Sequence, residues 1–148
     1  VVNVLQSVIL TKDDKMVLTP TYHVFRMFRV HQEAQLLNTD LRCEDYVLGD
    51  RKIPAISASA SVDKENKIHI SLANLNPNKE ITLTCPIIGE VYKTVSGEVL
   101  TANEMAAYNT FEKPEAVKPA PFNGYKLKEG TLTVTMPPKS VVVLELTK

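Results

Sequence analysis

The sequence predicts a mainly β protein, an antiparallel β-sandwich of jelly-roll type that is preceded by one strand and one helix. From about residue 34 onward, apolar and polar residues alternate with period two in several short segments, and turn residues separate these segments. Before residue 34, an almost continuous apolar run leads into a segment whose apolar residues have helical spacing. We therefore expect two parts, residues 1–33 and residues 34–148.

The first part begins with the apolar run of residues 1–10, which is typical of a strand buried on both faces. After a polar turn over residues 12–15, Thr19 is a suitable N-cap and Pro20 fits the first helical position. The helix is predicted over residues 20–33, and its apolar face contains Val24, Phe25, Met27, Phe28 and His31. A buried strand followed by an amphipathic helix is half of a βα unit. It cannot bury itself alone and belongs in a barrel or a doubly wound sheet.

The second part contains the strands of the sandwich. They are predicted over residues 56–62, 68–73, 80–85, 90–95, 99–101, 132–136 and 142–146. We expect the first three to form a meander and the last two to form a hairpin that turns at residues 137–140. Ser96 and Gly97 are expected to separate the two middle strands. The predicted core consists of Ile56, Ala58, Ile68, Ile70, Leu72, Ile81, Leu83, Leu132, Val134, Val142 and Leu144.

Residues 102–124 contain three prolines and little periodicity, so they predict a long surface loop, anchored by Tyr108, Phe111 and Phe122. A loop of this length is unusual in a compact domain and often has a function.

Composition excludes several classes of function. The formal net charge is zero and no basic run is present, so nothing indicates nucleic acid or an anionic membrane as a partner. No apolar stretch approaches the roughly 20 residues of a membrane span.

Cys43 and Cys85 are too few and too far apart for a disulfide framework or a zinc site, and we expect reduced thiols. The chain opens inside an apolar run without a signal peptide, so we expect an upstream segment, which could carry any targeting signal. We expect a cytoplasmic location.

A search for catalytic groups finds no complete site. The candidate acids Asp13, Asp14, Asp40, Glu44, Asp45 and Glu112 all stand in polar turns or loops, where a carboxyl group keeps its ordinary acidity. His23, His31 and His69 lack metal-ligand spacing, and the sequence has no glycine-rich phosphate loop. We therefore expect no catalytic residue, no metal and no cofactor in this chain.

Two kinds of side chain remain as candidates for binding. Tyr46, Tyr92, Tyr108 and Tyr125 could form a stacking platform for a sugar, or they could cap the core with their hydroxyls at its rim. Gln6 follows the apolar run at or near the C-terminal end of the expected strand. In α/β barrels that end of the strand carries the ligand chemistry.

The sequence resembles the α-L-arabinofuranosidases of glycoside hydrolase family 51. The specific segments are Asn3-Val4-Leu5-Gln6, Leu18-Thr19-Pro20-Thr21-Tyr22-His23-Val24-Phe25 and Val30-His31-Gln32. Tyr108-Asn109-Thr110-Phe111, with Pro114 and Val117, and the stretch from Leu132 to Val141 extend the resemblance to the C-terminal end.

The resemblance implies a (β/α)₈ barrel followed by a jelly-roll sandwich. The parent enzyme would remove terminal α-L-arabinofuranosyl groups from arabinan, arabinoxylan or related oligosaccharides with retention of configuration. Its two catalytic glutamates would lie on barrel strands four and seven, outside this chain. Residues 1–33 would then be the remnant of the last βα unit, and Gln6 would hydrogen-bond the arabinose.

On this interpretation the partners are the barrel of the same enzyme, its arabinose-containing substrate and, in a homo-oligomer, a second copy. The alternatives are a free-standing carbohydrate-binding module, which exposed, coplanar tyrosine rings would favour, and a scaffold sandwich unrelated to sugar.

Overall fold

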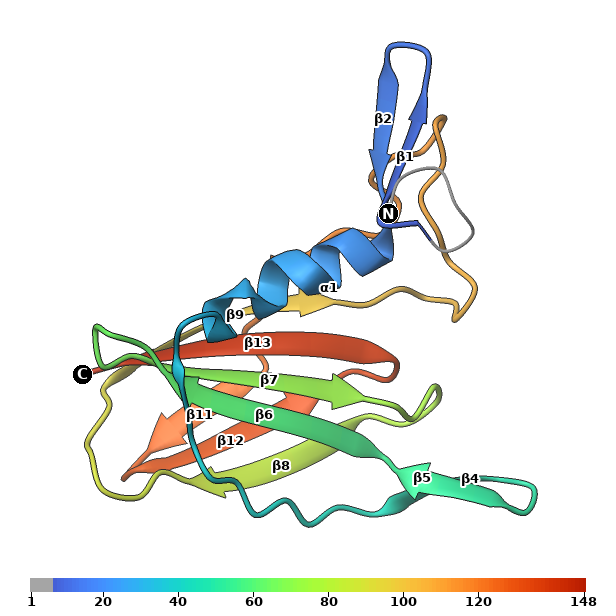
Figure 1. Ribbon diagram of the computed structural model, residues 1–148. Helices are drawn as coiled ribbons and strands as arrows, with labels where there is room; N and C mark the ends of the chain where they lie inside the picture. Colours follow the sequence, from blue (N-terminus) through green and yellow to red (C-terminus); the bar gives the residue numbers. More distant parts are fainter. Residues whose placement is uncertain (1–6) are drawn as a thin grey trace.

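The computed structural model describes residues 7–148, and its centre is a pair of facing antiparallel sheets (Figure 1). The larger sheet has the strand order β10-β9-β13-β7-β6-β3, and the smaller has the order β11-β12-β8. The strands of the larger sheet are β3 (Gln35–Leu36), β6 (Ile56–Val62), β7 (Ile68–Asn74), β9 (Thr94–Leu100), β10 (Ala120–Pro121) and β13 (Ser140–Thr147). Those of the smaller sheet are β8 (Ile81–Pro86), β11 (Tyr125–Lys128) and β12 (Thr131–Met136). The predicted sandwich is confirmed.

The core lies between the sheets, as the alternation predicts. In β6, Ile56 and Ala60 are buried while Ser57 and Ser59 are exposed, so the predicted register is confirmed. Nine of the eleven predicted core residues are buried, and Ala58 and Leu83 are partly buried against the same cluster.

Two predicted strand pairings are wrong. β6 and β7 pair, with Ala60 opposite Ile70, but β8 crosses to the other sheet and pairs with β12. Likewise β12 and β13 form no hairpin, because β13 lies in the larger sheet between β7 and β9. Alternation predicts which side chains face the core, but it does not predict which strands pair with each other.

The predicted break at Ser96-Gly97 is also wrong, because β9 runs through both residues. Gly97 lies opposite Leu144 of β13, and a Cβ atom there would stand 2.7 Å from Leu144 Cδ2 and 3.3 Å from Phe122 Cδ1. The glycine therefore makes room for the Phe122 ring inside a continuous strand.

Two segments extend from the sandwich (Figure 1). The first is a hairpin of β4 (Asp45–Leu48) and β5 (Arg51–Pro54). The second is the predicted long loop, of which we call residues 101–119 the brace. Phe122 is buried as predicted and Phe111 is partly buried, but Tyr108 is 69% exposed. Asn109 and Val117 anchor the brace instead.

The N-terminal arm, residues 7–31, differs from the predicted single strand and helix. Ile9 and Leu10 belong to β1 (Ile9–Lys12), which forms an antiparallel hairpin with β2 (Lys15–Leu18) around the predicted polar turn. The helix α1 (Pro20–Phe28) is shorter than expected and continues as a 3₁₀ turn, η1 (Arg29–His31). Gln32, with extended backbone at φ of −69° and ψ of 133°, ends helical geometry.

Candidate functional site

The N-terminal arm is held together where its hairpin meets its helix. Thr19 has the extended backbone of an N-cap, and its Oγ1 accepts a hydrogen bond from the Tyr22 N–H at 3.4 Å. The Thr19 hydroxyl lies 3.0 Å from the Ser7 carbonyl oxygen and 2.9 Å from that of Val8. The Thr19 N–H also donates to the Val8 oxygen. One predicted cap therefore also joins the helix to the residues before β1.

The helix rests on the outer face of the larger sheet (Figure 1). Met27 is buried in a small apolar cluster with Leu100, Val117 and Val143, drawn from β9, the brace and β13. Arg26 Nη2 forms an ion pair with Glu98 Oε2 at 2.7 Å, but both side chains are largely exposed. We therefore attribute the attachment mainly to the burial of Met27.

His31 makes the second attachment, at the end of the arm. Its Nδ1 lies 2.6 Å from Ser61 Oγ, and its Nε2 lies 2.6 Å from Ser71 Oγ. Both serines are buried on the outer face of β6 and β7. Burial, with a smaller contribution from neighbouring His69, lowers the pKa of His31. The imidazole is therefore a neutral bridge between the arm and the sheet.

Another histidine, His69, is buried beside this bridge. His69 Nε2 is 2.9 Å from Asp63 Oδ2, and His69 Nδ1 is 3.9 Å from Glu145 Oε2. Burial opposes ionisation of Asp63, but hydrogen bonds from His69 and from the N–H groups of Lys67 and Glu65 outweigh it and lower the Asp63 pKa. Asp63, His69 and Glu145 line an open groove of about 760 Å³ between the helix and the sheet. Arg26, Arg29 and Glu98 also line it.

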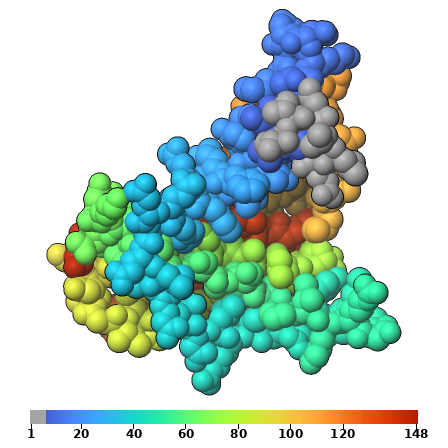
Figure 2. Space-filling view, viewed as in Figure 1, coloured from blue at the N-terminus to red at the C-terminus, as the bar shows by residue number. Residues whose placement is uncertain are grey.

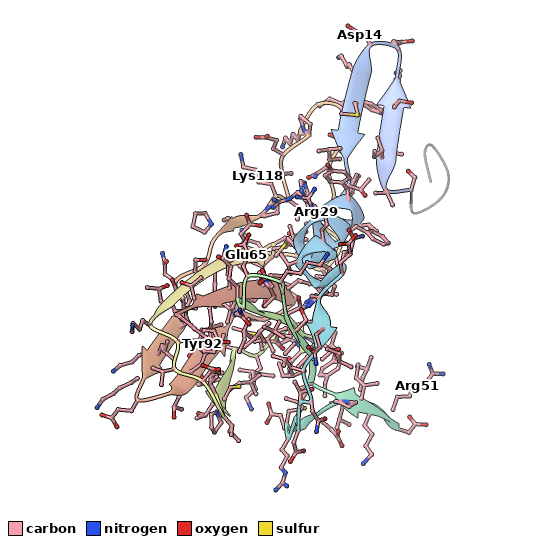
Figure 3. The ribbon with its side chains drawn as sticks, turned by 60° about the vertical axis from the view of Figure 1, so that its left-hand side comes forward. Asp14, Arg29, Arg51, Glu65, Tyr92 and Lys118 are labelled. Carbon is pink, nitrogen blue, oxygen red and sulfur yellow. The ribbon has the colours of Figure 1, made fainter. Side chains whose placement is uncertain are left out.

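The arm presents large apolar side chains to solvent. Phe25 of α1 is 67% exposed, and Met16 of β2 and Phe28 of α1 are also exposed. Of the predicted apolar face, Met27 alone is fully buried. The arm projects from the sandwich with the brace beside it (Figure 2), and Asp14 marks its tip (Figure 3). An apolar face of this kind on a projecting element is typical of an interaction surface.

The predicted binding residue Gln6 lies outside the described residues. The candidate acids are exposed, and three of them pair with nearby cations: Asp40 with Arg42, Glu44 with Lys79 and Asp45 with Lys52. Among residues 7–148, no cluster of histidine, cysteine or acidic side chains has the geometry of a metal site. No helix within that range is long and apolar enough to cross a membrane.

The tyrosines do not gather into a stacking platform over the described chain. Tyr92 is buried, and the Tyr125 hydroxyl donates to the Val95 carbonyl oxygen at 2.7 Å. Tyr46 packs against the core. Tyr108 is exposed, but it lies on the brace rather than on a sheet face. Three of the four rings therefore cap the core, which was one of the two interpretations of the sequence.

A cleft opens between the sheets where β6 and β8 leave the core uncovered. Its volume is about 640 Å³, and residues 38–42 lie over it. Its walls are the apolar side chains of the core, including Ile70, Leu72 and Leu132. Cys85 also lines it, and burial raises the pKa of this thiol, which favours its protonated form. Both cysteines are free, as expected.

Comparison with known proteins shows a match along the whole chain. Residues 1–140 match the family described as the alpha-L-arabinofuranosidase C-terminal domain. An intracellular exo-alpha-L-arabinofuranosidase of Bacteroides ovatus is 50% identical over 147 residues, which are 99% of this chain and 29% of that protein.

Two solved structures illustrate the likeness of fold. The GH51 arabinofuranosidase from Xanthomonas axonopodis pv. citri has a TM-score of 0.96 and 41% identity over 99% of this chain and 30% of its own. A family 51 alpha-L-arabinofuranosidase from Bifidobacterium longum, at 24% identity, shares the fold with a TM-score of 0.87 over 99% of this chain and 29% of its own. The chain therefore spans less than a third of the length of these relatives.

Proposed function

Because the chain belongs to the family of alpha-L-arabinofuranosidase C-terminal domains, we propose that it is the accessory C-terminal region of a retaining arabinofuranosidase. The parent enzyme would hydrolyse terminal α-L-arabinofuranosyl groups of arabinan, arabinoxylan or related oligosaccharides. The observation that carries the proposal is a match along 99% of this chain to proteins more than three times as long. We also propose an intracellular location, which the name of the Bacteroides ovatus relative supports.

The proposed division of the chain has residues 1–33 as the end of a (β/α)₈ barrel and residues 34–148 as the sandwich. The exposed Phe25, Phe28 and Met16 support it, because a barrel would need an apolar face on this arm to pack against. The hairpin of β1 and β2 would be the loop that follows the last barrel strand. Loops in that position form the substrate site in α/β barrels.

The isolated chain should not hydrolyse arabinofuranosides. Retaining hydrolysis needs two carboxyl groups about 5 Å apart across the scissile bond. The acids considered as candidates are exposed and, where paired, are paired with lysine or arginine. The test compares the purified chain with the full-length enzyme on a chromogenic arabinofuranoside. Turnover by the chain that disappears when one of its own acids is replaced would contradict the proposal.

Gln6 is the residue of this chain that we propose to contact the sugar in the intact enzyme. An amide offers a donor and an acceptor to sugar hydroxyls and adds no charge that would compete with the catalytic glutamates. Gln6→Ala in the full-length enzyme should weaken transition-state binding by about 1–3 kcal/mol, with little change in Tm. An unchanged kcat/KM, or a loss that only follows a fall in Tm, would show a structural role instead.

A further inference from the structure

Asn109 is a buried amide that ties the brace to the N-terminal arm. Its side chain is 3% exposed, although it stands in a loop. Its Nδ2 donates to the Leu18 carbonyl oxygen at 2.8 Å and to that of Val117 at 2.9 Å, while its Oδ1 accepts from the Val117 N–H at 2.7 Å. Only an amide supplies two donors and an acceptor from one uncharged group. The bond to Leu18 joins residues 91 positions apart.

Leu18 is the residue through which this bond reaches the start of the arm. It ends β2, where it pairs with Ile9, and it precedes the cap residue Thr19. Thr19 is bonded in turn to the carbonyl oxygens of Ser7 and Val8. Two hydrogen bonds and one peptide bond therefore separate Asn109 from Ser7.

The brace also approaches the tip of the hairpin. The pKa of Glu112, on the brace, is lowered by hydrogen bonds from the Glu112 backbone N–H and from Thr110. The positive charges of Lys12 and Lys15, on the hairpin, lower it further. The brace and the hairpin lie side by side when the molecule is seen from two directions (Figures 1 and 3). The contact at Asn109 is thus one part of a longer association between the brace and the arm.

We propose that Asn109 is a positioning residue, through which the sandwich holds the β1–β2 hairpin in place at the substrate cleft of the intact enzyme. This inference rests on the proposed function, in which that hairpin follows the last barrel strand. It assigns the long loop of the sandwich a role in catalysis without contact with the sugar. Displacement of a binding group by about 1 Å is enough to cost up to a hundredfold in rate.

Asn74 provides a matched control. It is 2% exposed, its Nδ2 donates to the oxygens of Lys79 and Pro137 at 2.9 and 2.8 Å, and its Oδ1 accepts from the Asn76 N–H at 3.0 Å. It ends β7 inside the sandwich and makes none of these bonds to the arm. Asn109→Asp and Asn74→Asp each place a carboxylate against two carbonyl oxygens, so both should lower Tm by a similar amount.

The experiment measures kcat and KM of the full-length enzyme well below the lower Tm. Asn109→Asp should lower kcat/KM about tenfold to a hundredfold, and Asn74→Asp should leave it within about twofold of the wild type, because a distant site is independent of the reaction. If either aspartate variant fails to fold, the pair Asn109→Ser and Asn74→Ser makes the same comparison with a smaller, uncharged side chain. Equal effects of a matched pair on kcat/KM would overturn the proposal.

One further measurement separates this inference from the proposed function. Amide hydrogen exchange in β1 and β2 should accelerate in Asn109→Asp and not in Asn74→Asp, and equal exchange would refute the positioning. A wild-type enzyme that does not cleave arabinofuranosides would refute the proposed function, while the exchange result would still decide whether Asn109 holds the hairpin.

Discussion

The His31 bridge should contribute a large part of the attachment between the N-terminal arm and the sandwich. His31→Ala removes two hydrogen bonds of 2.6 Å and leaves the hydroxyls of Ser61 and Ser71 buried without that partner. A neutral hydrogen bond contributes about 1 kcal/mol net, and a buried group that loses its partner costs about 1–3 kcal/mol. Water that enters the vacated space would satisfy part of this loss. We therefore expect a fall of about 2–4 kcal/mol in the free energy of unfolding.

The assay is urea unfolding of the chain, with stability taken from the midpoint and the slope. Arg29→Ala is the control, because Arg29 belongs to the same 3₁₀ turn but is exposed, and its replacement should change stability by no more than about 0.5 kcal/mol. The triple variant His31→Leu, Ser61→Ala and Ser71→Ala should recover most of the loss, since it removes all the partners together. A His31→Ala variant as stable as the Arg29→Ala control would refute this reasoning.

Three other predictions concern acidity, packing and surface charge. The pKa of His31 lies below its ordinary value of 6.5 in the folded chain, so the unfolded chain binds the proton first as the pH falls. The stabilising contribution of His31 should therefore be complete above about pH 6.5 and should decrease as the pH drops below it. Urea midpoints measured from pH 7 to 5 should show a smaller decrease for His31→Ala than for the wild type. Gly124→Ala would place a Cβ atom 2.6 Å from the Thr135 carbonyl oxygen and 2.6 Å from Phe122 Cζ. The free energy of unfolding, measured by thermal unfolding, should therefore fall by about 1–3 kcal/mol. An unchanged Tm would show that the backbone of β12 shifts at no cost to accept the methyl group. Arg26→Ala breaks an exposed ion pair with Glu98, so it should lower the free energy of unfolding by less than about 1 kcal/mol, and by still less in 1 M salt. A larger decrease that does not depend on salt would mean that the aliphatic part of the arginine packs on the sheet.

Local chemistry was enough to predict where the helix begins and which faces of the sandwich strands are buried. Thr19 and Pro20 predict the helix start because capping and the missing proline N–H are properties of neighbouring residues. The alternation of Ile56 and Ala60 with serines predicts which face of β6 is buried, because a strand has period two whatever its partner. The membership in the arabinofuranosidase family was also predicted from motifs, and it is confirmed along the chain. The role of Gln6 stays a prediction.

The partners of each strand and the covering of its outer face depend on contacts that no short pattern contains. β8 selects β12 rather than β7, and β9 continues through Gly97 because Phe122, distant in sequence, packs over it. The pattern also assigns Ser61, His69 and Ser71 to the outer, polar face, yet all three are buried. They are buried because the arm folds back over β6 and β7 and places His31 between the two serines. The sequence thus determined the alternation and the cap, while tertiary packing decided that the polar face of the sheet became the attachment site of the arm.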